Sequence, residues 1–188
     1  MTTVIESPGS GWNPPPPDLV AAAPRVTVTT ATPADTDAAL AMLSRCSRDS
    51  LYHRFHGYTD GLAYTRRLMN GPTFGDRPRL DPSAGSQPPP VDESFLAWNH
   101  STCIGMATIS SDDAAVAHLG VLVEDGWQRR GIGTRLIQAL IDAARWNGLT
   151  RVHADVLGED QFVIKVLRRV GSLKLAIVLG TYEVDIDL

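Results

Sequence analysis

Short stretches of alternating apolar and polar residues recur along this chain of 188 residues and predict β-strands with one buried face. The first stretch, Arg-Val-Thr-Val-Thr-Thr, covers residues 25–30. Similar patterns predict strands over residues 95–98, 102–110, 115–123 and 151–157, and a closing hairpin of residues 173–178 and 182–187 around Gly180. Residues 95–98 and 102–110 are expected to pair, because only Asn99-His100-Ser101 separates them.

Apolar residues at helical spacing mark the segments between these strands. Residues 133–146 carry such a stripe, formed by Leu136, Ala139, Leu140, Ala143 and Ala144. Thr32 before Pro33 predicts the cap and first turn of an earlier helix. A second helical region is predicted over residues 49–70 and a last helix over residues 159–170, which Gly171 ends. Strands and helices together predict an α/β fold.

The connection between the predicted strand 115–123 and the predicted helix 133–146 suits an anionic ligand. Residues 128–134, Gln-Arg-Arg-Gly-Ile-Gly-Thr, run directly into the helix. A helix start presents unpaired backbone N–H groups and the positive end of the helix dipole, and both favour a pyrophosphate. Gly131 and Gly133 let the backbone approach the ligand closely. The motif Val-x4-Gln-x-x-Gly-x-Gly therefore predicts the phosphate clamp of an enzyme that uses a coenzyme A thioester.

Other phosphate motifs fit this segment less well. A P-loop needs Lys and Ser/Thr after its second glycine, whereas Thr134 and Arg135 follow Gly133. The dinucleotide fingerprint needs a third glycine where the chain has Leu136. Glycines also occur in ordinary strand-to-helix turns, so the prediction depends on the whole motif and its arginines.

With these residues the chain resembles the GNAT superfamily of acyl-CoA N-acyltransferases from Arg25 to the C-terminus. Residues 158–171 are similar to the Glu-Asn-x-x-Ala-x-x-Leu-Tyr-x-x-x-Gly-Phe segment of that family. The resemblance implies a GNAT-like mixed, mostly antiparallel sheet of about six to seven strands flanked by helices. It also implies that acetyl-CoA is a co-substrate and that its pantetheine arm pairs with the strand ending at Val123. The residues expected at the coenzyme are Val121, Leu122, Val123, Gln128, Arg129, Arg130, Gly131, Ile132, Gly133, Thr134 and Asp160.

An amine acceptor must lose a proton before it attacks a thioester. A lysine has a pKa of about 10.4, so making it a free base near neutral pH costs about 4 kcal/mol, which a general base partly offsets. His118 stands where similar protein-lysine acetyltransferases, with the pattern Ala-Glu-Val-Ala, carry a catalytic Glu. Asp155 matches the Glu base of the ribosomal N-terminal acetyltransferase branch, with a shorter side chain. Glu124 and Asp125 lie beside the clamp; His118 is the preferred candidate and Glu124 the next.

The chain departs from the family pattern at three positions. Leu167 stands where many members have a Tyr that protonates the leaving thiolate, and Asp160 and Ser172 replace the usual Asn and Phe. A coenzyme A thiolate can leave without a dedicated acid, and Tyr182 is a possible substitute. These departures favour a second hypothesis, a catalytically weak acyl-CoA-binding regulatory module.

Residues 50–55, Ser-Leu-Tyr-His-Arg-Phe, resemble the Ser-x-x-Ser-x-Tyr-x-Arg-Phe segment of the same protein-acetyltransferase branch. In that branch the helix borders the acceptor site, which implies that Tyr52, His53 and Arg54 contact the substrate. The alternative is an amphipathic helix that packs Tyr52 and Phe55 in the core.

Composition and charge restrict the classes of function. The length and the 43% apolar content fit one domain, residues 25–188, behind a Pro-rich tail of residues 1–24 that is expected to be disordered. A long Pro-rich loop, residues 71–92, is expected to be an insertion or a lid. The net charge of −4 argues against nucleic acid, and no apolar run is long enough to cross a membrane. Cys46 and Cys103 are expected to be reduced thiols of a cytoplasmic protein, and no His/Cys spacing predicts a metal site.

The sequence therefore predicts an N-acetyltransferase that moves an acetyl group from acetyl-CoA to a primary amine. A protein lysine or N-terminus is favoured over a small-molecule amine. The regulatory module named above and a docking module built on the Pro-rich segments are the alternatives. The protein is expected to be a monomer or a homodimer.

Overall fold

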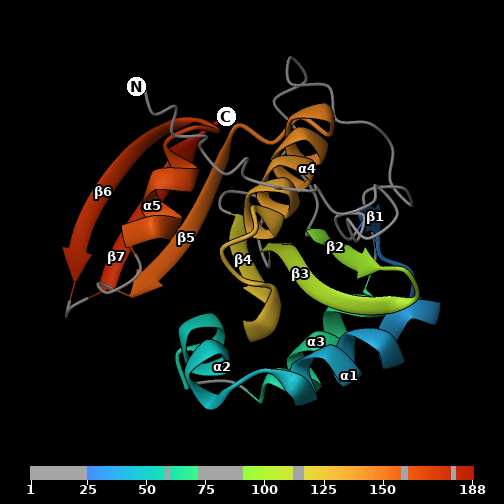
Figure 1. The fold of residues 1–188 in the computed structure, drawn as a ribbon. Coiled ribbons are helices and arrows are strands. Elements are labelled where there is room, and N and C mark those ends of the chain that lie inside the picture. The colour runs from blue at the N-terminus through green and yellow to red at the C-terminus, as the bar shows by residue number, and fades with distance from the viewer. Residues whose placement is uncertain (1–24, 58–59, 72–90, 112–116, 158–160, 179–180) are drawn as a thin grey trace, which may run out of the picture.

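A seven-stranded sheet forms the centre of the molecule, with strand order β1-β2-β3-β4-β5-β7-β6 (Figure 1). The computed structural model describes residues 25–57, 60–71, 91–111, 117–157, 161–178 and 181–188. The strands are β1 (Val26–Thr30), β2 (Val91–Asn99), β3 (Thr102–Ser111), β4 (Ala117–Val123), β5 (Arg151–Leu157), β6 (Ser172–Val178) and β7 (Thr181–Asp187). Only β4 and β5 are parallel neighbours, so the sheet is mixed and mostly antiparallel, as predicted.

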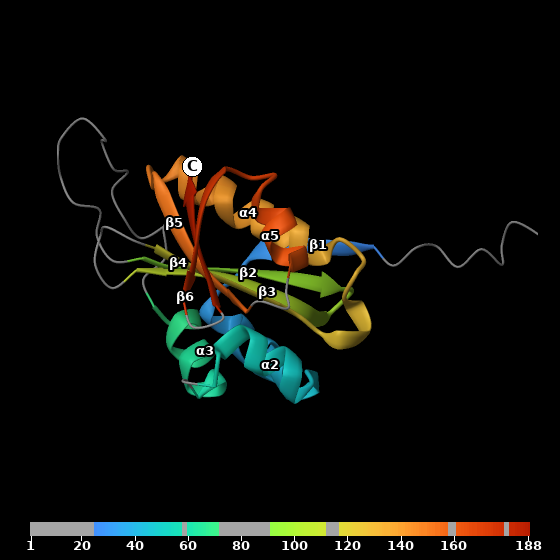
Figure 2. The same ribbon diagram turned by 90° about the vertical axis from the view of Figure 1, so that its left-hand side faces the viewer.

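Helices cover both faces of this sheet (Figure 2). One face carries α1 (Thr36–Arg45), α2 (Arg48–Phe55) and α3 (Gly61–Met69), and the other carries α4 (Ile132–Trp146) and α5 (Gln161–Leu167). Short 3₁₀ turns, Pro33–Asp35 and Asp125–Trp127, precede α1 and α4. No helix in these ranges is long and apolar enough to span a membrane.

Each face of the sheet has its own apolar core. The larger core is centred on the stripe of α4, in which Leu136, Leu140 and Ala144 are fully buried, and it includes Leu167 of α5. The smaller core joins α1 and α3 to the opposite face through Met42, Leu96, Met106 and other side chains. Because alternate residues of a strand face opposite sides, β4 contributes Leu119 to the first core and Leu122 to the second.

The predicted helical region over residues 49–70 is wrong at its centre, where the structure has two helices. His56 ends α2 in the left-handed conformation, with φ 53°, and Gly57 follows with φ 71°. The Ser47 hydroxyl caps the start of α2, and the Asp60 carboxylate caps the start of α3. The chain can therefore turn between the helices without leaving their first N–H groups unpaired.

Strand β2 begins earlier than the alternation of residues 95–98 predicts. The predicted loop 71–92 is correspondingly too long, because Asp92 lies in β2 and accepts a hydrogen bond from the Ser110 hydroxyl at 2.8 Å. Residues 72–90 and the predicted tail 1–24 lie outside the described residues. The predicted hairpin of β6 and β7 is confirmed, and its pairing runs from Ser172–Asp187 to Val178–Thr181.

Candidate active site

Strands β4 and β5 separate soon after they begin. Their parallel pairing is confined to Ala117 with Val152 and His118 with His153. Beyond these pairs β5 leans away from β4, and α2 lies beneath their C-terminal ends (Figure 1). The β4 edge that faces β5 is therefore free of sheet pairing after His118, while its other edge stays paired with β3. Such an edge offers backbone N–H and C=O groups to a ligand.

A cavity of about 320 Å³ lies where these strands separate. Its walls come from the middle of β4, the second half of β5, the end of α2 and single residues of α3 and α5. The lining residues are His53, Arg54, Phe55, His56, Tyr64, His118, Leu119, Gly120, Val121, Ala154, Asp155, Val156, Leu157 and Val163. The cavity thus contains His118 and Asp155, the candidate bases on β4 and β5, and also His53 and Arg54 from the predicted acceptor helix.

A hydrogen-bonded chain of side chains lies beside His118. Nδ1 of His153 is 3.0 Å from an Asp185 oxygen, and its Nε2 is 3.1 Å from an Asp155 oxygen. The His118 and His153 rings meet edge to face, 5.2 Å between centroids. Burial lowers the pKa of His153, but hydrogen bonds and charge attraction from both carboxylates outweigh it, so the net shift is upward. His153 therefore bridges the carboxylates of Asp155 and Asp185 next to the candidate base.

The loop before α4 has the backbone geometry that a phosphate clamp needs. Gly131 is the N-cap residue of α4, with φ 78°, and Arg129 also has a positive φ of 60°. A Cβ added at Gly131 would meet no protein atom within 4 Å, so the space above this glycine is open. The side chain of Ile132 is buried in the core, so it is only the backbone of this residue that can face a ligand. Arg130 stacks on Trp127, with its Cζ 5.0 Å from the ring centroid.

Side-chain contacts fasten this loop to the start of α2. The Asp125 carboxylate accepts hydrogen bonds from the backbone N–H and hydroxyl of Ser47, at 2.8 and 2.7 Å, and from the Ser50 hydroxyl at 2.9 Å. Bonds from Ser47 lower the pKa of Asp125. Gln128 donates to the Ser50 hydroxyl and to the Val123 carbonyl. Gln128 and Asp125 therefore position this loop. The hydrogen bonds that their side chains form in the structure are made to other residues of the protein.

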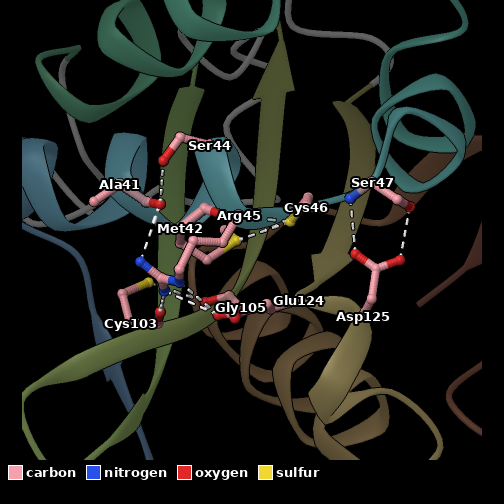
Figure 3. Close-up of polar contacts among 10 residues, drawn as sticks. All are labelled: Ala41, Met42, Ser44, Arg45, Cys46, Ser47, Cys103, Gly105, Glu124 and Asp125. Carbon is pink, nitrogen blue, oxygen red and sulfur yellow. Dashed lines mark hydrogen bonds and ion pairs between the residues drawn. The ribbon is translucent and has the colours of Figure 1, made fainter.

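Glu124 lies outside the residues that line the cavity and forms an ion pair with Arg45 (Figure 3). Its carboxylate accepts from Nε and Nη2 of Arg45 at 3.1 and 2.9 Å, and Nη2 also donates to the Cys103 carbonyl. The pKa of Arg45 is raised, chiefly by its hydrogen bond with Glu124. This geometry gives Glu124 the role of holding α1 against the end of β4.

Both cysteines near this ion pair are free thiols, as predicted. Burial raises the pKa of Cys46 to about 12 and that of Cys103 to about 11. A thiol with such a pKa stays protonated near neutral pH, so neither residue is a nucleophile there.

The predicted acceptor residues divide between two sides of α2. His53 and Arg54 line the cavity, whereas Tyr52 is 55% exposed and faces a separate apolar hollow beside Leu62. The alternative, an amphipathic helix with Tyr52 and Phe55 in the core, holds for Phe55, which is partly buried, and is wrong for Tyr52. Asp160, expected at the coenzyme, lies outside the described residues, and Leu167 is buried in the core.

The potential ligand atoms of His118, His153 and Asp155 lie within 4.8 Å of one another, which is close enough to hold a metal ion. Sequence spacing did not predict this group, because its members come from two strands. Both ring nitrogens of His153 already lie at hydrogen-bond distance from carboxylates. The contacts of His153 are therefore those of a histidine hydrogen-bonded to two carboxylates, and they fit a metal centre less well.

His153 and Asp185 were missed by the sequence analysis. The alternation of residues 151–157 places His153 on the same face as Asp155. The proximity of these two side chains could therefore have been predicted from the sequence. Asp185 joins them because β7 lies between β5 and β6 and pairs Asp185 with His153. The hairpin pattern alone does not show which of its strands lies next to β5.

Comparison with known proteins agrees with this architecture. The Acetyltransferase (GNAT) family model matches residues 62–171. The acetyltransferase Pat of Mycolicibacterium smegmatis is 33% identical over 76 residues, which are 40% of this chain and only 23% of that relative.

Solved structures share the fold at lower identity. The GNAT domain of S. lividans PAT has a TM-score of 0.67 at 21% identity, covering 87% of this chain and 90% of that one. An acetyltransferase from Salmonella typhimurium, solved with its cofactor acetyl-CoA, has a TM-score of 0.59 at 16% identity, covering 87% and 94%. Residues 62–171, which the family model matches, include β4, β5, the loop between β4 and α4, and α4 itself. Because this match covers more than half of the chain, the chain belongs to the acetyltransferase (GNAT) family.

Proposed function

We propose that this acetyltransferase transfers the acetyl group of acetyl-CoA to a primary amine in the cavity between α2, β4 and β5. The observation that carries the proposal is that one cavity holds the His118 ring and borders the unpaired edge of β4, and that β4 runs on from there into the glycine loop at the start of α4. The coenzyme chemistry is that of the family to which the chain belongs.

The backbone around the clamp would hold the coenzyme. The N–H groups at the start of α4 suit the pyrophosphate, since Gly131 leaves open space there. The free edge of β4, from Leu119 to Val123, suits the pantetheine arm and a thioester carbonyl that gains negative charge during attack. Val121 is at the cavity wall, so this edge leads the acetyl group into the cavity.

The side chains of the cavity would handle the proton. His118 accepts a proton from the ammonium, the neutral amine attacks the thioester carbonyl, and the C–N bond forms as the C–S bond breaks. The thiolate leaves, and the nitrogen gives up its second proton to complete the amide. Of the two protons lost by the nitrogen, one is taken up by the thiolate, from His118 or through solvent, and the other is released. His153, held by Asp155 and Asp185, fixes the neighbourhood of His118 and keeps a positive charge beside it.

The amine is proposed to belong to a protein lysine or N-terminus. This is supported by the Ser-Leu-Tyr-His-Arg-Phe segment, because its His53 and Arg54 line the same cavity as His118. A regulatory acyl-CoA-binding module remains the second candidate, since Leu167 is buried where related enzymes have a tyrosine acid.

Two measurements made together separate these candidates. Thiol release from acetyl-CoA is followed with pooled peptides and small amines, and acetyl-CoA binding is measured by calorimetry. Amine-dependent thiol release supports the enzyme, and faster release with peptides supports a protein acceptor. Tight binding without release for any amine would make the protein an acyl-CoA sensor instead.

A further inference from the structure

Arg54 places a positive charge in the cavity, and no anionic partner for it lies among the described residues. Its Nη2 donates to the buried Thr108 hydroxyl at 2.6 Å, and Tyr64 is another hydrogen-bonding neighbour. Its Cζ lies 4.9 Å from the centroid of the Phe55 ring and 5.7 Å from that of Tyr64. No carboxylate of the described residues forms an ion pair with Arg54. Within the described part of the chain, hydroxyl groups and aromatic rings are therefore its polar and ring partners.

This environment is unfavourable for a guanidinium group. Burial lowers the pKa of Arg54, and the interactions with Tyr64 only partly oppose that shift. Its Nε is buried and has no hydrogen-bond partner. Arginine nevertheless stays protonated in proteins, so the charge persists and an anion in the cavity would relieve it.

Arg54 is the one permanent cation among the described residues that line the cavity. Three histidines, His53, His56 and His118, also line it, and Asp155 is its only carboxylate among the described residues. The full chain carries a net charge of −4 with its histidines counted as neutral, and on the same count Arg54 and Asp155 cancel in the described lining. A ligand with an anionic group would therefore be attracted by Arg54 itself and not by an excess of positive charge around the cavity.

The guanidinium group also lies on the same side of the sheet as the candidate base. It occupies the space where a side chain at Gly120 would begin, so any larger residue at this position of β4 would displace the guanidinium group. His118 and Gly120 are two residues apart and face the same side of β4, about 7 Å apart along the strand. A single acceptor can therefore reach His118 with its amine and Arg54 with a second group.

We propose that Arg54 binds a carboxylate of the acceptor, so that the preferred substrate is an amine with a carboxylate nearby. This inference rests on the proposed function of the same cavity. A carboxylate matches one guanidinium in charge and in its planar, two-pronged geometry. A phosphate dianion would need a second permanent cation, and Arg54 is the only Arg or Lys among the described residues that line the cavity. The carboxylate is either an acidic side chain next to a peptide lysine or the α-carboxylate of a free amino acid.

The first test uses the wild-type protein and matched acceptors. One arm compares lysine peptides in which an adjacent Glu is replaced by Gln, and the other compares free amino acids with their carboxamides. The carboxylate form should give a kcat/KM about ten- to hundredfold higher than its amide, as expected for a charge-assisted hydrogen bond. A preference in the peptide arm alone points to a protein acceptor, and one in the amino-acid arm alone points to a small molecule.

The second test changes Arg54. Arg54→Gln should abolish the preference for the carboxylate form and leave acetyl-CoA affinity within about twofold. Arg54→Lys should restore part of the preference, because lysine keeps the positive charge but lacks the planar, two-pronged guanidinium group. Arg168→Gln is the matched control, since it removes one positive charge outside the cavity lining. Melting temperatures show whether the Arg54 variants fold.

Failure of the inference and failure of the proposed function give different results. Equal kcat/KM for carboxylate and amide acceptors with wild-type protein would overturn the inference while the acetyltransferase reaction stands. If no amine releases thiol, the proposed function fails. Calorimetry with the coenzyme A complex then decides the inference: tighter binding of the Glu peptide than of the Gln peptide supports it, and equal binding overturns it.

Discussion

The loop proposed to bind the coenzyme and the cavity proposed to bind the acceptor both adjoin strand β4, but they are built differently. The loop, residues 124–134, is continuous in sequence and presents mainly backbone, with Gly131 as the N-cap residue of α4. The cavity is assembled from α2, α3, β4, β5 and α5, and its chemistry depends on side chains such as His118 and Arg54. Backbone groups can hold a ligand with little dependence on side-chain identity, whereas recognition in the cavity depends on particular side chains. Substitutions in the two regions should therefore have separable effects.

The largest effect is expected at Gly131. Gly131→Val adds a branched side chain at a φ of 78°, in the space where the pyrophosphate is expected, so it should abolish acetyl-CoA binding in calorimetry. Gly126→Val is the matched control, because Gly126 lies in the same loop, also with open space, and without a positive φ. Undiminished binding by a folded Gly131→Val variant would remove the clamp from this loop.

The next largest effect is expected at His118. His118→Ala should lower kcat by about 10²–10⁴ with little change in acetyl-CoA affinity, because it removes the base and leaves the clamp intact. His100→Asn is the control, since His100 lies in an exposed turn at a positive φ that Asn tolerates. An unchanged kcat in His118→Ala would move the role to Asp155 or to positioning alone.

A smaller effect is expected at Arg130, which is exposed and stacks on Trp127. Arg130→Ala should weaken acetyl-CoA binding by about 1–2 kcal/mol, the contribution of one charge-assisted contact. The loss should shrink at high salt, which screens exposed charges. Arg168→Ala should leave the affinity unchanged. Equal affinities for wild type and Arg130→Ala in low salt would limit the clamp to backbone groups.

The smallest effect concerns the His153 network. Because the folded-state pKa of His153 is raised, the stabilisation is fully present below the unfolded pKa of about 6.5 and is lost as pH rises through the folded value. Asp185→Asn should therefore lower the free energy of unfolding at pH 6. The decrease should be less than about 1 kcal/mol, because the Asp185 carboxylate is partly exposed, and it should be smaller at pH 9 than at pH 6. Denaturant unfolding at both pH values measures this. A difference that grows with pH would contradict a protonated His153.

The sequence predicted the strand, turn and helix around residues 124–134 well because these residues are neighbours in the chain, and coenzyme binding by this loop stays a prediction. The strand, the glycines and the apolar stripe of α4 lie within one segment, and the structure places them as strand, turn and helix. Strand pairing by short connections, as in β2 with β3 and β6 with β7, was predicted for the same reason.

Features that depend on distant contacts were predicted poorly. Glu124 was a candidate base, but its carboxylate pairs with Arg45, 79 residues earlier in the chain. Asp185 reaches His153 only because β7 lies beside β5. The break between α2 and α3 depends on His56, a non-glycine residue in the left-handed conformation. Local pattern carries no signal for any of these, since each is decided by tertiary packing.

A crystal structure of the complex with acetyl-CoA would test the central claim most directly. The account predicts the pyrophosphate at the N–H groups of Gly131 and Gly133, the pantetheine arm along the free edge of β4, and the acetyl carbon inside the cavity beside His118. A pyrophosphate bound elsewhere, or an acetyl group directed away from the cavity between α2, β4 and β5, would contradict it.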